Sequence, residues 1–304
     1  MNRTKQGRAA VFAVLAAALY ALSTPLSKYL TSEHVGPKMM ASLLYLGAGL
    51  GMALTGLIRK AAGREEKQKR MSRKDLPFVV GMILLDIAAP LSLMAGLQSA
   101  TAANVSLMNN FEIVATSLIA LIVFRERISP KVWCAIGLIT ASTMLLSFEG
   151  GDSLRFTGGS LLILLACVCW GFENNCTRML SYGDPLSIVA VKGFGSGVGA
   201  LIIALAAGEA VPRFVWLAFA LLLGFVAYGL SIYFYVYAQR DLGAAKTSAY
   251  YAIAPFIGSA LSMLIFRSWP SGGFWPALLL MILGVDLISE HPVLFRSRKS
   301  VALD

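Results

Sequence analysis

Long apolar stretches fill most of the chain, and short polar segments separate them. Ten apolar runs can be marked, each close to the roughly 20 residues that a helix needs to cross the hydrocarbon core of a bilayer. This pattern predicts an all-α polytopic membrane protein. The ten expected transmembrane helices cover Ala9–Leu30, Met39–Ile58, Pro77–Leu97, Ala102–Phe124, Pro130–Phe148, Gly158–Leu180, Leu186–Ala207, Phe214–Ala238, Ala245–Phe266 and Phe274–Ser289.

Composition leads to the same class. Of the 304 residues, 57% are hydrophobic and 14% are charged, and the mean hydropathy is +0.71. A soluble domain cannot enclose so much apolar surface. The first run is longer than the apolar core of a signal peptide and continues through Pro25 and Lys28 without a clean cleavage site. We therefore expect it to remain as the first helix.

The basic residues indicate how the chain is oriented. The net charge is +10, and Lys and Arg gather in the short segments between the apolar runs. If the N-terminus is cytoplasmic, most of the 26 Lys and Arg residues fall on the cytoplasmic side. This bias predicts a multi-pass protein of the cytoplasmic membrane with both termini in the cytoplasm. In such a protein the positive charge orients the chain in the lipid bilayer, and no nucleic-acid partner is expected.

The two halves of the chain, residues 1–150 and 151–304, show a weak internal repeat. When the second half is slid over the first by 142 positions, a few collinear pairs match, namely Ala102 with Ala244, Ala103 with Ala245, Ser106 with Ser248, Phe124 with Phe266 and Trp133 with Trp275. At an offset of 150, Lys28 meets Arg178. Because each half holds five expected helices, an odd number, the second half must enter the membrane in the opposite orientation. Inverted five-helix repeats are typical of secondary transporters, whose site lies near the midplane where the repeats meet.

Four short motifs point to a known family. They are GLQSATAANVS between the third and fourth expected helices, FRER after the fourth, CWGFENNCTR in the sixth and AQRDLGAAKTS before the ninth. With the five-plus-five pattern, they resemble the EamA-type branch of the drug/metabolite transporter superfamily, over nearly the whole chain. The resemblance implies an exporter-like carrier that works without ATP, with a central cavity lined by helices of both repeats. It does not name the solute.

Two acids interrupt the expected helices close to their middle. Asp86 is about nine residues into the third helix and Glu112 about ten into the fourth, which places both near mid-membrane at roughly 1.5 Å per residue. A charged side chain in hydrocarbon is costly, so such acids usually mark a pathway. The short connector makes the two helices antiparallel neighbours. We therefore expect the acids to repel each other, so that at least one holds a proton. A proton-coupled site, a cation site and a neutral hydrogen-bonded core group all stay open.

Amides and an aromatic residue accompany these acids. Asn109 is three residues before Glu112 and shares its helical face, whereas Asn110 lies to one side. Either amide could orient a polar substrate or bond to a neighbouring helix. Trp170, three residues before Glu173 in the sixth helix, is the aromatic residue that we expect to face the site.

A second polar group lies toward the cytoplasmic ends of the sixth and seventh helices. Glu173 and Asn174 occupy the sixth helix and Lys192 the seventh, and the short link SYGDP joins the two. Glu173 and Lys192 can meet at one depth, so we expect an ion pair, since a buried charge without its partner is costly. The pair could fix two helices together or form part of a cytoplasmic gate or substrate path.

Other classes of function leave few signals in the sequence. The two His residues are far apart in the topology, and no catalytic triad, phosphate loop or metal-ligand spacing is visible, so we expect neither an enzyme nor a cofactor or metal. The four cysteines lie in apolar runs and are expected to be packing residues.

The sequence thus predicts a secondary transporter of a small polar or amphipathic organic solute that works by alternating access, with Glu112 as the principal proton- or cation-binding group. An uncoupled facilitative carrier and a non-transporting membrane receptor or scaffold are the alternatives, and the oligomeric state stays open.

Overall fold

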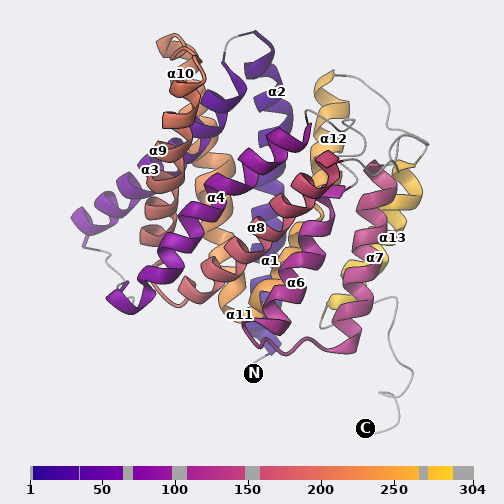
Figure 1. The fold of residues 1–304 in the computed structure, drawn as a ribbon. Coiled ribbons are helices and arrows are strands. Elements are labelled where there is room, and N and C mark those ends of the chain that lie inside the picture. The colour runs from indigo at the N-terminus through magenta and orange to yellow at the C-terminus, as the bar shows by residue number, and fades with distance from the viewer. Residues whose placement is uncertain are drawn as a thin grey trace, which may run out of the picture.

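The protein is described by a computed structural model over residues 3–33, 35–63, 71–97, 108–147, 158–266 and 273–289. Within these ranges the chain is mainly helical, and its helices pack side by side in a bundle (Figure 1). The elements are α1 (Arg3–Ala21), α2 (Ser23–Glu33), α3 (Pro37–Ala61), the 3-10 turn η1 (Arg73–Asp75), α4 (Leu76–Leu97), α6 (Phe111–Ile122), α7 (Pro130–Ser147), α8 (Gly158–Leu180), α9 (Pro185–Ala206), α10 (Phe214–Leu223), the π-helical segment η3 (Gly224–Leu230), α11 (Ser231–Tyr251), α12 (Ala254–Phe266) and α13 (Phe274–Ile288).

The expected first helix is divided at Leu22 into α1 and α2. Pro25 lies in the first turn of α2, where its missing N–H removes no bond that a helix start would make. The two pieces still form one apolar span, Lys5–Thr31. α3 begins with Pro37, and the backbone N–H of Met39 donates to the Glu209 carboxylate at 2.7 Å. That charge stabilises the positive end of the helix dipole.

The expected fourth helix is shorter than the sequence suggested. A turn at Asn110 precedes α6, and the chain leaves the helix before Arg125, whose φ is 52°. The first part of that apolar run, residues 102–107, lies outside the described residues, as does the boundary between the expected halves at residues 148–157.

In the second half, one long helical stretch contains the eighth expected helix and the start of the ninth. α10, η3 and α11 follow each other without a loop, and Gly243 interrupts α11 with a φ of 80°. This left-handed conformation suits glycine, and it separates the runs Phe214–Ala238 and Ala245–Phe266. A second break at residues 252–253 divides the latter run between α11 and α12.

Length and hydropathy identify six spans able to cross a bilayer within the described ranges. α6, α7 and α13 are apolar but shorter, so the expected ten helices are not reached by these two criteria alone. Many large apolar side chains point outward, among them Leu54, Ile122 and Leu222, each more than half exposed. So many exposed apolar side chains are unusual for a soluble monomer and fit a surface that faces lipid.

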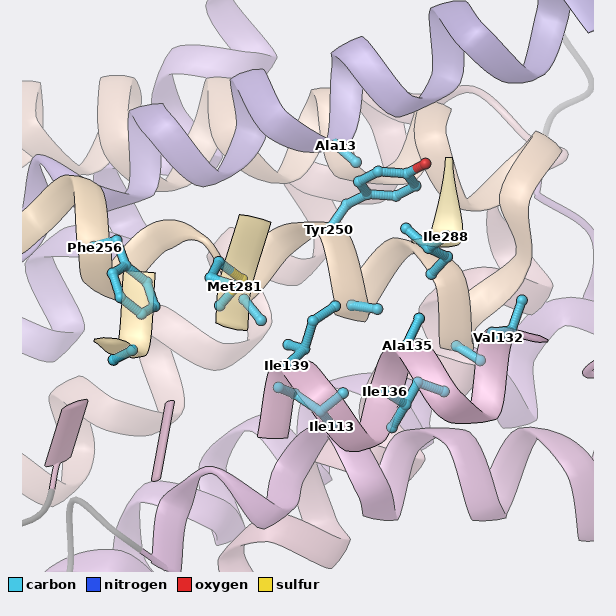
Figure 2. Packing of buried hydrophobic residues seen from close by; sticks show 14 of the residues in the cluster. Ala13, Ile113, Val132, Ala135, Ile136, Ile139, Tyr250, Phe256, Met281 and Ile288 are labelled. Carbon is cyan, nitrogen blue, oxygen red and sulfur yellow. The ribbon is translucent and has the colours of Figure 1, made fainter. Parts of the chain in front are cut away.

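The largest apolar core joins the two ends of the chain. α7 packs along α13, and α1 packs along α11. Figure 2 shows Ile139 of α7 facing Met281 of α13, and Ile136 and Tyr250 belong to the same cluster. Elements from both halves of the chain therefore share this core.

Glycines allow close packing between α3 and α9. A methyl group on Gly193 would lie only 2.4 Å from the backbone nitrogen of Gly49, and one on Gly197 would lie 2.8 Å from Leu46. The two backbones therefore approach each other directly, as small residues allow in membrane helices. This interface fixes α9, which carries Lys192.

Candidate functional site

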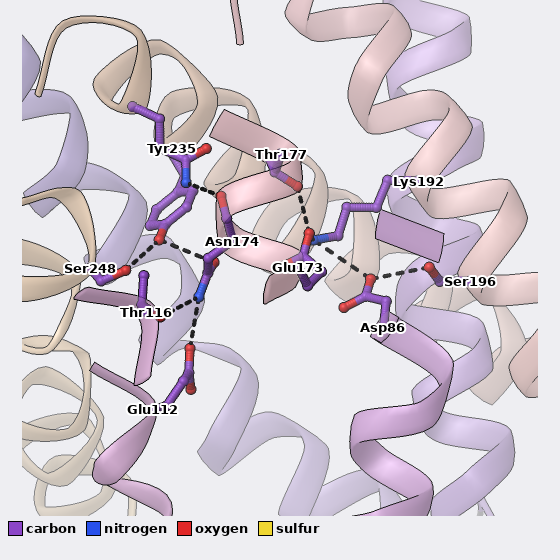
Figure 3. Close-up of polar contacts among 11 residues, drawn as sticks. Asp86, Glu112, Thr116, Glu173, Asn174, Thr177, Lys192, Ser196, Tyr235 and Ser248 are labelled. Atoms are coloured by element: carbon purple, nitrogen blue, oxygen red, sulfur yellow. Dashed lines mark hydrogen bonds and ion pairs between the residues drawn. The ribbon is translucent and has the colours of Figure 1, made fainter. Parts of the chain in front are cut away.

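Glu112 lies at the start of α6 and faces α8. Its Oε1 accepts a hydrogen bond from Nδ2 of Asn174 at 3.1 Å, and the same amide reaches Thr116 Oγ1 at 3.3 Å (Figure 3). Glu112 is half-buried, while Thr116 is fully buried one turn further along α6. The acid thus lies on the inward side of the helix, away from the exposed Leu118.

Asn174 connects this acid to α11. Its Oδ1 accepts a bond from the Tyr235 hydroxyl at 3.2 Å, and that hydroxyl also pairs with Ser248 Oγ at 3.0 Å. Gln239 donates from Nε2 to the Asn174 backbone oxygen at 2.9 Å. One amide therefore joins α6, α8 and α11 at a single point.

A second cluster holds three charges away from water. Lys192 Nζ lies 2.7 Å from Glu173 Oε1 and 3.6 Å from Asp86 Oδ2. All three residues are at most 6% exposed. Thr177 donates to Glu173 at 2.5 Å and Ser196 donates to Asp86 at 3.1 Å. The predicted pair of Glu173 and Lys192 is confirmed, and Asp86 extends it to a triad.

The structure corrects the expectation that Asp86 and Glu112 are direct neighbours. Both α4 and α6 pack against α8, and each acid has partners of its own. Figure 3 shows Glu112 and Asp86 well apart, with the α8 residues Glu173 and Asn174 between them. Small residues let α8 approach, since a methyl group on Gly171 would lie 2.9 Å from the Thr116 nitrogen. The short connector between their helices therefore does not bring Asp86 and Glu112 into direct contact.

The remaining predicted residues lie at the edge of this network. Asn110 forms the turn before α6, Asn109 precedes it in helical conformation, and the Cys167 thiol lies 3.6 Å from the Asn109 backbone oxygen. Asn110 precedes α6 without capping it through its side chain. Trp170 is half-buried on α8, one turn before Asn174. The bonds described above link Glu112, Asn174 and Tyr235 through their own side chains and those of Thr116 and Ser248.

A row of tyrosines links the two clusters, and we call it the tyrosine row. Consecutive ring centroids are 5.0 to 5.5 Å apart. The row runs in the order Tyr45, Tyr228, Tyr20, Tyr251 and Tyr235. These tyrosines come from α1, α3, η3 and α11, so no spacing in the sequence relates all five rings.

A third set of polar contacts joins the segment after α6 to α8 and α11. The Glu126 carboxylate accepts from the backbone N–H of Ala244 at 3.0 Å, just after the left-handed Gly243. Arg178 Nε lies 3.8 Å from the same carboxylate. Glu126 belongs to the FRER motif, so the signal was in the sequence, but its partners become visible only in three dimensions.

The cysteines do not form a site. Cys167 and Cys176 are buried, but Cys134 is exposed on α7, so the expectation that all four pack in the interior is wrong for Cys134. Within the described ranges, no group of three or more His, Cys, Asp or Glu side chains is arranged to hold a metal ion.

The fold and its interior define a class. A helical protein with an apolar outer surface and a charged network inside its bundle is a multi-pass membrane protein, and such networks mark functional regions. The sequence model of the EamA-like transporter family matches the chain twice, over residues 7–148 and 157–290. The chain belongs to this family, which is part of the drug/metabolite transporter superfamily.

Two relatives bear the name of uncharacterized transporters. An uncharacterized transporter of Methanothermobacter thermautotrophicus is 28% identical over 84% of this chain and 78% of that protein. The uncharacterized transporter YyaM of Bacillus subtilis is 24% identical over 56% of this chain and 59% of that protein. A protein of known crystal structure has the same fold, with a TM-score of 0.79 at 18% identity, covering 95% of this chain and 98% of the other.

Proposed function

We propose that this protein is a secondary transporter that moves a small polar or amphipathic organic solute out of the cell by alternating access. The solute crosses between two inverted five-helix repeats, residues 1–150 and 151–304, in the cytoplasmic membrane. Transport is coupled to protons through Glu112. The observation that carries the proposal is the bond from Glu112 of the first repeat to Asn174 of the second.

Two matches of one family model, one in each half, support the repeat. The helix contacts do so as well. In the proposed repeats α1 corresponds to α8, and α4 corresponds to α11. The contact of α1 with α11 therefore corresponds to the contact of α8 with α4, and both pairs pack closely. α3 corresponds to α9 and α7 to α13, and each of these helices packs against its own counterpart in the other repeat. This pattern is what a two-fold axis in the membrane plane produces.

Helix breaks fall at equivalent places in the repeats. The turn at Asn110 before α6 matches the turn at Ala252 before α12 in the sequence register that pairs Ala102 with Ala244. Broken helices free backbone groups near the midplane, which is where transporters of this architecture place their substrates. Glu112 lies directly after the first break.

A proton on Glu112 changes the contact between the repeats. Ionised, the carboxylate accepts the Asn174 amide in a charge-assisted bond, the stronger kind of hydrogen bond. Protonated, it holds that amide less strongly and gains a donor of its own. Because Asn174 also binds Tyr235, protonation weakens the link among α6, α8 and α11. Proton binding thereby biases the two arrangements that alternating access requires.

The experiment uses full-length protein in liposomes loaded with a mixture of cellular metabolites. Mass spectrometry identifies solutes that leave faster than from protein-free liposomes, with and without a pH gradient. We expect one or a few solutes to move and the gradient to drive their flux. Glu112→Gln, which keeps the shape and remains neutral at every pH, should lose the gradient-driven part.

A matched control is Glu209→Gln, another helix-terminal carboxylate away from the network, which should keep the gradient dependence. Flux that ignores the gradient in the parent protein supports the uncoupled carrier instead. A Glu112→Gln protein as active and as pH-dependent as the parent contradicts proton coupling at this residue, and the absence of any flux contradicts transport.

A further inference from the structure

We propose that the solute is an organic cation with an aromatic or similarly apolar body, held with its charged nitrogen beside Glu112 and its body against the tyrosine row. This inference rests on the proposed transport function and names the chemical class of its substrate. It combines the charge balance of the interior, the aromatic surface between the acids, and the surplus of hydrogen-bond acceptors.

The charge balance favours a cation. Among the described side chains of the two clusters, Asp86, Glu112 and Glu173 are acidic and Lys192 is basic. Lys192 is shared between Asp86 and Glu173, so its ammonium is not available to bind an anion. Glu112 has an amide partner rather than a cation. An ammonium placed beside Glu112 supplies the missing counter-charge, which stabilises a carboxylate that is partly withdrawn from water.

The tyrosine row provides the surface that an organic cation needs. The row starts at Tyr45, whose hydroxyl lies beside Asp86, and ends at Tyr235, which bonds Asn174. Tyr20, in its middle, is near enough to both Glu112 and Asp86 to interact with their charges. Faces of aromatic rings attract cations, most strongly where water is excluded.

The five tyrosines of the row differ in how far each residue is buried. Tyr20, Tyr45, Tyr228 and Tyr251 are half-buried, whereas Tyr235 is buried by its contacts with Asn174 and Ser248. The part of these four side chains that stays accessible is the surface that we assign to the body of the ligand. A simple inorganic cation would make no use of it, because it has no apolar body to bury.

The hydrogen-bond inventory points the same way. Asn175 Oδ1 and Gln239 Oε1 are buried acceptors without a hydrogen-bond partner in the described part of the chain. Both residues flank Asn174, since Gln239 bonds its backbone and Asn175 follows it in α8. A site rich in acceptors selects a ligand that brings N–H donors, because buried acceptors left without donors weaken binding.

The test compares three probes with one carbon skeleton and different charge. Purified full-length protein is titrated by calorimetry with phenethylamine, phenethyl alcohol and phenylacetate at pH 7.5. We expect the amine to bind about tenfold or more tightly than the alcohol, because removing one partner of a charge pair commonly lowers affinity by at least this much. The anion should bind most weakly. Glu112→Gln should remove most of this preference.

Ring variants separate the aromatic contact from folding. Tyr20→Phe keeps the ring and should retain amine binding within about twofold, whereas Tyr20→Leu should lose about three- to tenfold, the range of a cation–π contact. Tyr182→Leu, in an exposed position between α8 and α9, is the matched control and should bind as the parent does. Each variant is first checked for an unchanged melting temperature.

The two proposals fail in different ways. Equal affinity for the three probes, preference for phenylacetate, or no binding of the amine overturns the cation inference, while metabolite flux in liposomes keeps the transport function. Tight amine binding that depends on Glu112 and Tyr20, without flux of any solute, supports the cation site and overturns transport.

Discussion

At the scale of single residues, Lys192 is a buried cation whose charge balances two buried carboxylates. It is 6% exposed and contacts two carboxylates that are each 3% exposed. Buried ion pairs add little net stability when complete, because desolvation offsets most of the attraction. Removing one partner is different, since it leaves uncompensated charge in the interior.

Replacing Lys192 with Met should therefore destabilise the protein strongly, by about 3 to 5 kcal/mol. Thermal unfolding in detergent measures this change. The loss should shrink as the pH falls, because protonation neutralises the two abandoned carboxylates and the unpaired charge disappears.

Two comparisons check this prediction. Lys60→Met, at an exposed position of α3, should leave the melting temperature nearly unchanged. Adding Asp86→Asn and Glu173→Gln to Lys192→Met should recover part of the stability. A Lys192→Met protein that melts as the parent does at neutral pH would show that the triad is not charged in the folded protein.

At the scale of helices, backbone contact between α3 and α9 positions the charged cluster. Gly193 follows Lys192 directly and faces Gly49, so the closest approach of the two helices lies beside the triad. A side chain at this point has nowhere to go except into the backbone of α3. The approach is thus fixed by the absence of a side chain.

Gly193→Ala should destabilise the protein by about 1 to 3 kcal/mol, the usual cost of overpacking, and should also disturb Lys192. Gly56→Ala is the matched control, because a methyl group at Gly56 of α3 meets nothing within 4 Å. Thermal unfolding compares the two. Equal melting temperatures would mean that α3 and α9 separate easily, contrary to the packing described.

At the scale of the whole molecule, the helix contacts support the proposal that the two repeats have opposite orientations. α1 pairs with α11 as α8 pairs with α4, so each repeat contributes to the packing of the other. Together with the distribution of Lys and Arg, this arrangement predicts that the segment after α3 is cytoplasmic and that the segment after α9 is external.

Single cysteines test this orientation in a variant that lacks the four native ones. Ala62→Cys follows α3 and Ala210→Cys follows α9, and both positions are exposed. A membrane-impermeant maleimide added to intact cells should label Ala210→Cys and should label Ala62→Cys only after the cells are permeabilised. The reverse pattern would invert the topology, and labelling of both would contradict the odd number of crossings between them.

Local signals determined much of this protein. Apolar runs of spanning length predicted the membrane helices, because the bilayer demands that backbone groups bond within each segment. The ion pair of Glu173 and Lys192 was predicted because the two residues lie at the same depth in helices that a short link joins. The family resemblance rested on short motifs and is confirmed by the family match. An unusual acid, Glu112, was visible because hydrocarbon tolerates so few charges.

Only the tertiary structure decided which of these groups meet. α8 lies against both α4 and α6, so Asp86 joined Lys192 instead of Glu112. The tyrosine row draws on α1, α3, η3 and α11, and no sequence spacing relates rings on different helices. Hydropathy places each helix across the membrane but leaves its rotation and neighbours open, because lipid tails accept any apolar face. The rotation and neighbours of each helix are set by glycine contacts and buried hydrogen bonds, which form only between helices in contact.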